Sequence, residues 1–265
     1  MRRRHLIALT SALGLLATSG LVVPTARAAD RACDPLDERL CLLPFPNDRF
    51  TTLDPTTPTG RRIDLSPLAT PRTVAGKPMD PTEWNRNDGF SPGSMILTVV
   101  PGLDLTTTFG LDTDPETGPG ADPFAARDEV PDALVEAPAL SMASGAPIVL
   151  LDADTGARHP YWAELDEHPE TLAGGHDRTL IIRPLANLEE GHRYIVALRD
   201  LRDAGGAELR PTPAFAALRE ALADAPGKGK PPAFPAPADI DPAEQDDRYR
   251  DIFRRLSAVG IDARD

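Results

Sequence analysis

Residues 178–200 read RTLIIRPLANLEEGHRYIVALRD, and this stretch decides the fold class. Two short apolar runs are separated by polar residues and a glycine, which is typical of two β-strands joined by a loop. In the second run Tyr194, Val196 and Leu198 alternate, so they share one face of a strand. Tyr194 follows a glycine-containing turn, where a tyrosine corner places the ring over the core and returns the hydroxyl to the preceding loop.

Neighbouring segments carry the same kind of signal. MILTVV at 95–100 ends at Pro-Gly and predicts a strand, and APIVLLDADTGARHPYWAELD at 146–166 predicts a strand, an Asp/Gly turn and a second strand. No strand alternates with a long helix, which argues against a doubly wound sheet. We therefore expect a mainly β fold, with an Ig-like antiparallel β-sandwich over residues 93–212.

The chain differs in composition on either side of that region. Residues 29–92 are rich in Pro and turn signals and are expected to form a largely irregular segment with enough apolar side chains to be ordered. Residues 213–265 predict a helix after Thr212, a Pro-rich linker, and a second helix that Gly260 ends. The second helix carries an apolar stripe, which suggests a docking surface: Tyr249, Ile252, Phe253, Leu256 and Val259.

The first 28 residues have the three parts of a secretory signal peptide. Arg2 to Arg4 form a positive region, residues 6–23 are apolar, and Ala26-Arg27-Ala28 is a small-residue cleavage signal. Cleavage after Ala28 predicts a secreted protein with no membrane span after signal cleavage. The alternative is a retained membrane helix. The apolar stretch is short, and its Ala, Gly and Thr residues make it a poor membrane anchor.

The mature chain is strongly acidic. Cleavage removes four Arg and no acid, so the formal net charge moves from −13 to −17. A surface of this charge argues against nucleic acid and anionic membranes as partners and favours solubility.

The two cysteines, Cys33 and Cys41, are the first and last residues of a nine-residue segment. An exported chain meets an oxidising compartment, so we expect a disulfide between them. On the chain-entropy model such a loop contributes about 2–3 kcal/mol to stability. The alternative, a catalytic thiol, lacks a paired histidine nearby.

Residues 89–93, Gly-Phe-Ser-Pro-Gly, match the G-x-S-x-G pattern of serine hydrolases. A nucleophile elbow requires a strand before the serine, a helix after it, and an oxyanion-hole N–H from the next residue. Here that residue is Pro92, which has no N–H, and the segments on either side do not predict strand and helix. We therefore expect Ser91 to lie in a turn and predict no catalytic residue.

Acidic and histidine side chains also recur at spacings that suggest metal ligands. Three groups have such a spacing: Glu164, Asp166 and His168; Asp112, Asp114 and Glu116; and Asp152 with Asp154. None has the spacing of a calcium loop, and Asp-rich turns or a solvated edge explain them. The histidines expected in the mature chain show no setting of a general base: His159, His168, His176 and His192. We predict no metal and no cofactor.

Four segments resemble, in order, the N-terminal region of secreted bacterial lipase/esterase-like proteins, known as the virulence-factor lipase N-terminal domain. They are LPFPNDRFT (43–51), NDGFSPGSMI (87–96), SGAPIVLLDADTG (144–156), and the stretch 178–209. The resemblance covers about residues 42–260. It implies a β-rich, non-catalytic module that precedes an α/β-hydrolase domain, and no position here matches a catalytic residue of that domain.

The expected function is therefore an exported accessory module whose partner is a missing or separate α/β-hydrolase domain. An enzyme is not predicted from this chain alone. The alternative is a stand-alone secreted Ig-like binding protein for a cell-surface glycan or protein. Aromatic residues are scarce, and the candidates for a sugar platform are Trp84 and Trp162.

Overall fold

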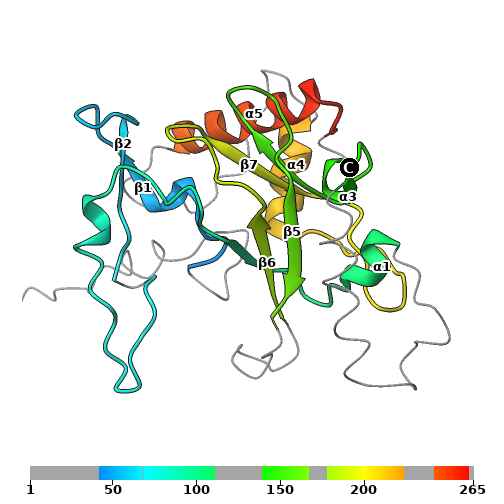
Figure 1. The fold of residues 1–265 in the computed structure, drawn as a ribbon, viewed down its shortest axis with the longest axis horizontal. Coiled ribbons are helices and arrows are strands. Elements are labelled where there is room, and N and C mark those ends of the chain that lie inside the picture. Colours follow the sequence, from blue (N-terminus) through cyan, green and yellow to red (C-terminus); the bar gives the residue numbers. More distant parts are fainter. Residues whose placement is uncertain (1–41, 68, 111–138, 167–177, 224–241, 263–265) are drawn as a thin grey trace, which may run out of the picture.

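The computed structural model describes residues 42–67, 69–110, 139–166, 178–223 and 242–262 (Figure 1). Ala28, Cys33 and Cys41 lie outside the described residues, so the predicted cleavage site and disulfide remain predictions. Within the described part of the chain, no helix is long and apolar enough to cross a membrane.

The described strands are all antiparallel and form three small sheets, which confirms the predicted mainly β class. A three-stranded sheet has the order β3-β6-β5, and a two-stranded sheet pairs β4 with β7. A third sheet is the hairpin of β1 and β2 in the N-terminal segment. The strand bounds are β1 Thr51–Leu53, β2 Arg61–Ile63, β3 Ile96–Val99, β4 Ile148–Asp152, β5 Tyr161–Leu165, β6 Thr179–Pro184 and β7 Tyr194–Leu198.

One core cluster takes side chains from the first two sheets. Ile148 and Leu150 of β4 pack with Tyr161 of β5 and with Leu180 and Ile182 of β6. All five side chains are at most 1% exposed. Burial of this apolar surface is the main term that holds the two sheets together.

The chain passes from one sheet to the other after the turn that follows β4. Arg158 forms a bridge with Leu151, and His159 N–H donates to the Leu150 carbonyl at 2.8 Å. Tyr161 then begins β5, and its buried hydroxyl donates back to the Ile148 carbonyl at 2.5 Å. This bond links the first residue of β5 to the first residue of β4.

Two longer helices follow β7, as the sequence predicted. Helix α4 (Pro213–Ala223) begins after Thr212, whose hydroxyl accepts from Phe215 N–H at 3.3 Å. Helix α5 (Pro242–Ala258) ends where Gly260 has φ of 79°. The end is a Schellman motif: Ile261 N–H bonds to the Leu256 carbonyl and Gly260 N–H to that of Ser257.

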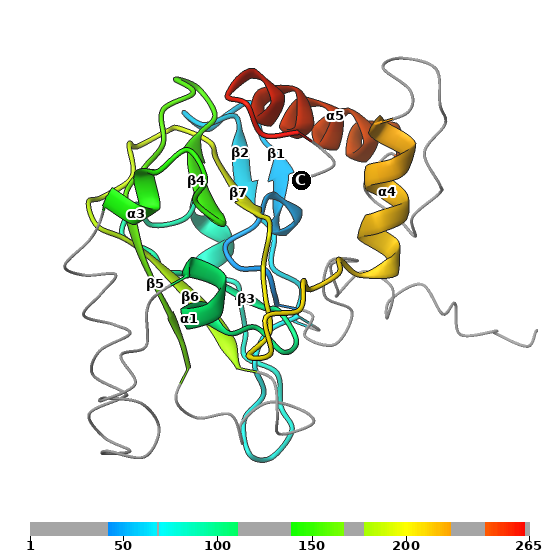
Figure 2. The same ribbon diagram turned by 90° about the vertical axis from the view of Figure 1, so that its right-hand side faces the viewer.

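Helix α5 packs on the face of the β4–β7 pair that lies away from the main core (Figure 2). Val149, Leu151 and Ile195 from the strands form a second cluster with Leu256 and the residue Ile261 just beyond the helix. Ile252 and Val259 are half-buried against the same cluster, and Phe253 stacks on Phe215 of α4. The suggestion that this stripe is a free docking surface was therefore wrong.

The N-terminal segment is turn-rich with its own small core, as expected. Its described residues contain two 3₁₀ turns, η2 (Asp48–Phe50) and η3 (Trp84–Arg86), besides the β1–β2 hairpin. Phe50, Ile63, Leu65 and Ala69 form a buried cluster. Two short helices complete the described fold, α1 (Leu105–Phe109) and α3 (Ala139–Met142).

Candidate functional site

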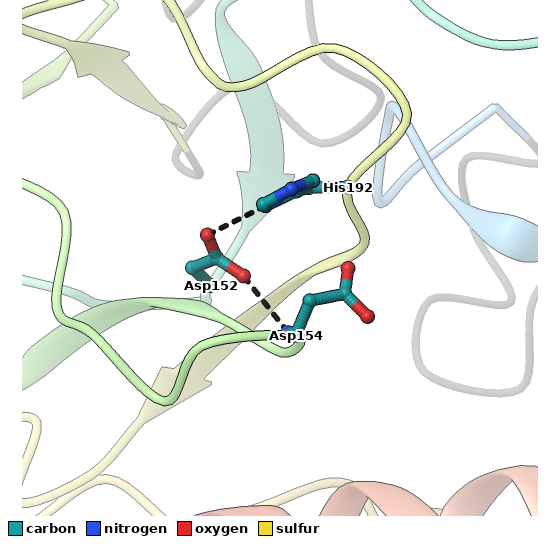
Figure 3. Close-up of side chains that lie close together, drawn as sticks. All are labelled: Asp152, Asp154 and His192. Carbon is teal, nitrogen blue, oxygen red and sulfur yellow. Dashed lines mark hydrogen bonds and ion pairs between the residues drawn. The ribbon is translucent and has the colours of Figure 1, made fainter.

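Asp152, Asp154 and His192 form the cluster of titratable side chains that most resembles a functional site (Figure 3). Asp152 is the last residue of β4 and is paired with Tyr194, the first residue of β7. This pairing brings the turn after β4 beside the loop before β7. The cluster therefore lies where two loops meet at one end of a strand pair.

The sequence Asp-Ala-Asp-Thr-Gly explains the first loop. One carboxylate oxygen of Asp152 accepts from the N–H groups of Asp154 and Thr155, at 2.8 and 3.1 Å. Gly156, with φ of 75°, donates its N–H to the Asp152 carbonyl at 2.8 Å. An aspartate that bonds to the backbone two residues on, followed by a glycine in the left-handed region, makes a tight turn. The prediction of an Asp-rich turn is confirmed here.

The second carboxylate oxygen of Asp152 lies 2.8 Å from His192 Nδ1. Burial favours a raised pKa for Asp152, but hydrogen bonds from His192, Asp154 and Thr155 outweigh it and lower the pKa below its ordinary value. The hydrogen bond to Asp152 raises the pKa of His192, and the charges of Asp152, Asp154 and Glu189 add to that effect against partial desolvation. The two side chains thus stabilise each other as an ion pair.

The third member, Asp154, is also engaged. Its carboxylate accepts from the backbone N–H of Arg193 at 2.9 Å. The ligand atoms of all three residues lie within 4.8 Å of one another, so a divalent ion could in principle bridge them. However, such an ion would have to take His192 Nδ1 from Asp152 and displace its proton. The atoms that could bind an ion already take part in hydrogen bonds within the chain. The cluster therefore fits a structural role better than a metal site.

An aspartate–histidine pair also suggests acid–base chemistry, which needs a nucleophile near the other ring nitrogen. Among the described residues no hydroxyl is hydrogen-bonded to the His192 ring. Ser91, the serine of the G-x-S-x-G pattern, is exposed and starts a turn in which Ser94 N–H donates to the Ser91 carbonyl at 3.0 Å. Pro92 and Gly93 occupy the central positions of that turn, as their conformational preferences favour.

The segments around Ser91 are also those the sequence predicted. Strand β3 follows at Ile96, where an elbow would have a helix, and the preceding regular element is the 3₁₀ turn η3. The carbonyl of Pro92 accepts from Leu188 N–H at 3.1 Å, which ties the turn to the loop before β7. Ser91 thus lies in a turn, and the absence of a catalytic role stays a prediction.

The other candidate residues are not brought together in the described structure. Glu164 pairs with Arg183 at 2.6 Å across β5 and β6. His159 Nε2 lies 3.0 Å from the Ala186 carbonyl, and its ring meets that of Tyr194 edge-on. His168, His176, Asp112, Asp114 and Glu116 lie outside the described residues.

The predicted tyrosine corner is present. The hydroxyl of Tyr194 accepts from the Glu189 N–H at 2.9 Å, five residues upstream, and the ring packs against the main core. The bond fixes the loop that carries His192 and Arg193. This is one reason why the loop can present both side chains in fixed directions.

Sequence reasoning missed a charged network that surrounds Arg193. The Arg193 guanidinium contacts Asp48 of η2 and Asp251 of α5, both at 3.1 Å. Asp251 also pairs with Arg255 at 2.8 Å, and Arg255 donates to the Ala153 carbonyl. The network joins four segments that are remote in sequence. Of these contacts, only the Asp251–Arg255 pair could be predicted from the sequence, because residues four apart on a helix lie side by side.

Comparison of the chain with models of protein families, with curated proteins and with solved structures found no match. The resemblance of the four segments therefore stays an expectation.

Proposed function

We propose that this chain is an exported, non-catalytic module of Ig-like sandwich architecture that accompanies a lipase- or esterase-type α/β-hydrolase domain. The proposal is supported by the four segments that resemble such modules and by the antiparallel strands that share one core. In this role the module shields or orients the hydrolase, and the reacting groups belong to the hydrolase.

The observation that carries the proposal is the geometry at Ser91. The residue after it is a proline, so the backbone there has no N–H to stabilise an acyl oxyanion. The turn continues into a strand, whereas the elbow of α/β-hydrolases leads into a helix. A serine without this surrounding is an ordinary turn residue.

The Asp152–His192 pair gives no second route to catalysis. Asp152 is 6% exposed, and its carboxylate is occupied by His192 and by two backbone N–H groups. His192 is held by the same carboxylate. This arrangement holds two loops together. Within the described residues, no hydroxyl is hydrogen-bonded to the His192 ring as a nucleophile would be.

The test is an ester hydrolysis assay on the purified mature chain, with short p-nitrophenyl esters and a serine-directed fluorophosphonate label. We expect no turnover above the buffer rate and no label on Ser91. The Ser91→Ala variant is the control, because Ser91 is exposed and its loss should not disturb folding. Turnover by the wild-type chain that Ser91→Ala abolishes would refute the proposal.

A second arm tests the partner. The DNA downstream of the codon for Asp265, and the neighbouring genes, should encode a G-x-S-x-G motif between a predicted strand and a predicted helix. When that polypeptide is produced with and without this module, the module should change its stability or its substrate range. A hydrolase that behaves identically in both forms would contradict an accessory role.

A stand-alone glycan-binding function is the second candidate, and one observation favours it. Trp84 is 48% exposed at the start of η3, whereas Trp162 is partly buried against the main core. An exposed indole can stack on a sugar ring. Binding to cell-wall polysaccharide that Trp84→Ala removes, with unchanged thermal stability, would support this function over the first.

A further inference from the structure

Strand β7 presents an edge of its backbone that the described chain leaves unpaired. Arg199 N–H donates to the Pro147 carbonyl, and Ala153 N–H donates to that of Arg193, so the odd-numbered residues from 193 to 199 face β4. Backbone groups of an antiparallel strand alternate in direction. The N–H and C=O groups of Tyr194, Val196 and Leu198 therefore point to the other side, and within the described residues no hydrogen bond reaches them.

The outer edge of β4 is covered, in contrast. The Ile148 carbonyl accepts from the Tyr161 hydroxyl and the Leu150 carbonyl from His159 N–H. Asp152 N–H donates to the Ala157 carbonyl at 2.9 Å. The chain thus satisfies this edge with its own next segment.

The edges of the three-stranded sheet are covered in part: within the described residues no hydrogen bond reaches the outward backbone groups of Ala163 on β5, but this residue is buried. On β3, Leu97 exchanges both backbone hydrogen bonds with Phe45 of the N-terminal segment, at 2.9 and 2.7 Å. On β5, Tyr161 N–H meets the hydroxyl of Ser141, and the Leu165 carbonyl accepts from the Arg178 guanidinium. Unpaired strand edges favour pairing with another chain, and proteins cover or charge them for this reason.

The uncovered edge also lacks the residues that discourage strand addition. Residues 194–198 read Tyr-Ile-Val-Ala-Leu, with no proline, no glycine and no charge. The chain does not return to pair with β7, because Asp200 turns it away with φ of 52°. Leu201 is then buried in the main core.

We propose that β7 of a second copy of this chain pairs with this edge, antiparallel and centred on Val196, to form a symmetric dimer. In that register Val196 lies opposite its own counterpart, and Tyr194 lies opposite Leu198 of the second copy. The outward groups of these residues make up to about six hydrogen bonds. The neighbouring side-chain pair is Ile195 with Ala197, so every pair within the five residues is apolar.

The flanking charges have a definite arrangement in the same register. His192 and Asp200 flank the paired segment at its two ends, and both side chains are exposed. Arg193 lies opposite Arg199, which is the one like-charge pair. Arg193 is already neutralised by Asp48 and Asp251, and Arg199 donates to the Ala146 carbonyl.

Helix α5 packs on one face of the β4–β7 pair, beside the proposed contact. Two neighbouring strands span roughly 10 Å, and a helix with its side chains has a diameter of about 10–12 Å. One helix therefore covers the β4–β7 pair without reaching far beyond β7. In the dimer the sheet has four strands, in the order β4-β7-β7-β4, and one α5 helix covers each half.

The experiment measures the mass of the full mature chain by sedimentation equilibrium from about 1 µM to about 1 mM, a range that detects weak dimers, at roughly 0.15 M ionic strength, which screens the acidic net charge. We expect a reversible monomer–dimer equilibrium. Val196→Pro removes an outward N–H without removing a bond to β4, and it should raise the dimer dissociation constant at least about tenfold.

Val74→Pro is the matched control. Val74 is fully exposed in the Thr73–Gly76 turn, at the position where proline is favoured, so this variant should dimerise as the wild type does. Amide exchange on the wild-type chain gives a second measurement that needs no variant. The amides of Val196 and Leu198 should exchange more slowly as the concentration rises, while those of Ile195 and Ala197 are protected throughout.

A wild-type chain that stays monomeric over the whole range would overturn the proposal. So would a Val196→Pro chain that folds and dimerises as the wild type does. Protection of the Val196 amide at every concentration would show that the chain covers this edge itself, which also overturns it. If Val196→Pro does not fold, the concentration dependence of exchange in the wild type decides.

Discussion

The carboxylate of Asp152 and Nδ1 of His192 lie 2.8 Å apart although the residues are 40 positions apart in the chain. The pair closes the end of the β4–β7 strand pair, since Asp152 ends one strand and His192 precedes the other. It also fixes the neighbour of His192, Arg193, whose guanidinium reaches both η2 and α5. A local ion pair therefore affects how three segments are held together.

The pH dependence of stability should follow this pair. The pKa of Asp152 is lowered, so its contribution is present above the ordinary aspartate pKa and is lost as the pH falls through the lower folded value. The pKa of His192 is raised, so its contribution is present below the ordinary histidine pKa and is lost as the pH rises through the higher folded value. Chemical unfolding at several pH values should show the pair's contribution greatest between these two limits.

Two variants separate this effect from other titrations. Asp152→Ala leaves the N–H groups of Asp154 and Thr155 without their acceptor, and we expect a loss of about 2–4 kcal/mol near pH 6. His192→Asn can still donate to Asp152 but does not titrate. The stability difference between wild type and His192→Asn should therefore shrink or reverse above neutral pH. A difference independent of pH would contradict the ion pair.

The hydroxyl of Tyr161 should contribute more to stability than that of Tyr194. Tyr161 is fully buried and donates to the Ile148 carbonyl, so Tyr161→Phe leaves a buried acceptor unpaired and should cost about 1–3 kcal/mol. Tyr194→Phe removes an acceptor from the Glu189 N–H in an exposed loop, where water replaces it, and should cost about 1 kcal/mol or less. Urea unfolding of both variants checks the order, and the reverse order would contradict it.

Helix α5 should be an integral part of the fold. Leu256 is 6% exposed against Val149, Leu151 and Ile195, so Leu256→Ala leaves a cavity and should cost about 2–4 kcal/mol. Arg254→Ala is the control on the same helix, because the Arg254 side chain is 74% exposed and its ion pair contributes little. Thermal unfolding of the two variants measures the difference. Equal melting temperatures would show that α5 is only loosely attached.

Divalent ions should not stabilise the chain. Asp152 and Asp154 accept hydrogen bonds from the backbone, and His192 is occupied by Asp152. We expect the same melting temperature with added calcium, with added zinc and with a chelator. A rise with either ion that Asp154→Asn abolishes would instead identify the cluster as a metal site.

The predicted disulfide can be checked by thiol titration. The chain has two cysteines, Cys33 and Cys41, and the unfolded, unreduced mature protein should contain no free thiol. Reduction should lower stability by about 2–3 kcal/mol if the loop packs on the fold. Two free thiols per chain in freshly exported protein would refute the prediction.

The sequence predicted the strands that carry a strong local pattern. Alternating apolar residues predicted β7, and a run of apolar residues predicted β4. The position of Tyr194 after Gly191 predicted that its hydroxyl bonds to the preceding loop. Thr212 and Gly260 predicted the start of α4 and the end of α5, because capping depends on neighbouring residues.

The sequence did not predict how these elements associate. The division of the strands into three small sheets and the packing of α5 on the β4–β7 pair depend on contacts between distant segments. The Asp152–His192 pair also depends on a contact between distant segments. Once Asp152 is known to lie opposite Tyr194, the position of His192 two residues earlier follows, but the pairing itself has no local signal.

The position of α5 has a consequence for how the chain acquires its structure. Synthesis proceeds from the N-terminus, so β4 and β7 are complete long before Leu256 and Ile261 have been made. Until then the outer faces of Val149, Leu151 and Ile195 have no cover from α5 and are open to non-specific association. A polypeptide released before residue 242 would keep this apolar surface exposed and should be found in the insoluble fraction.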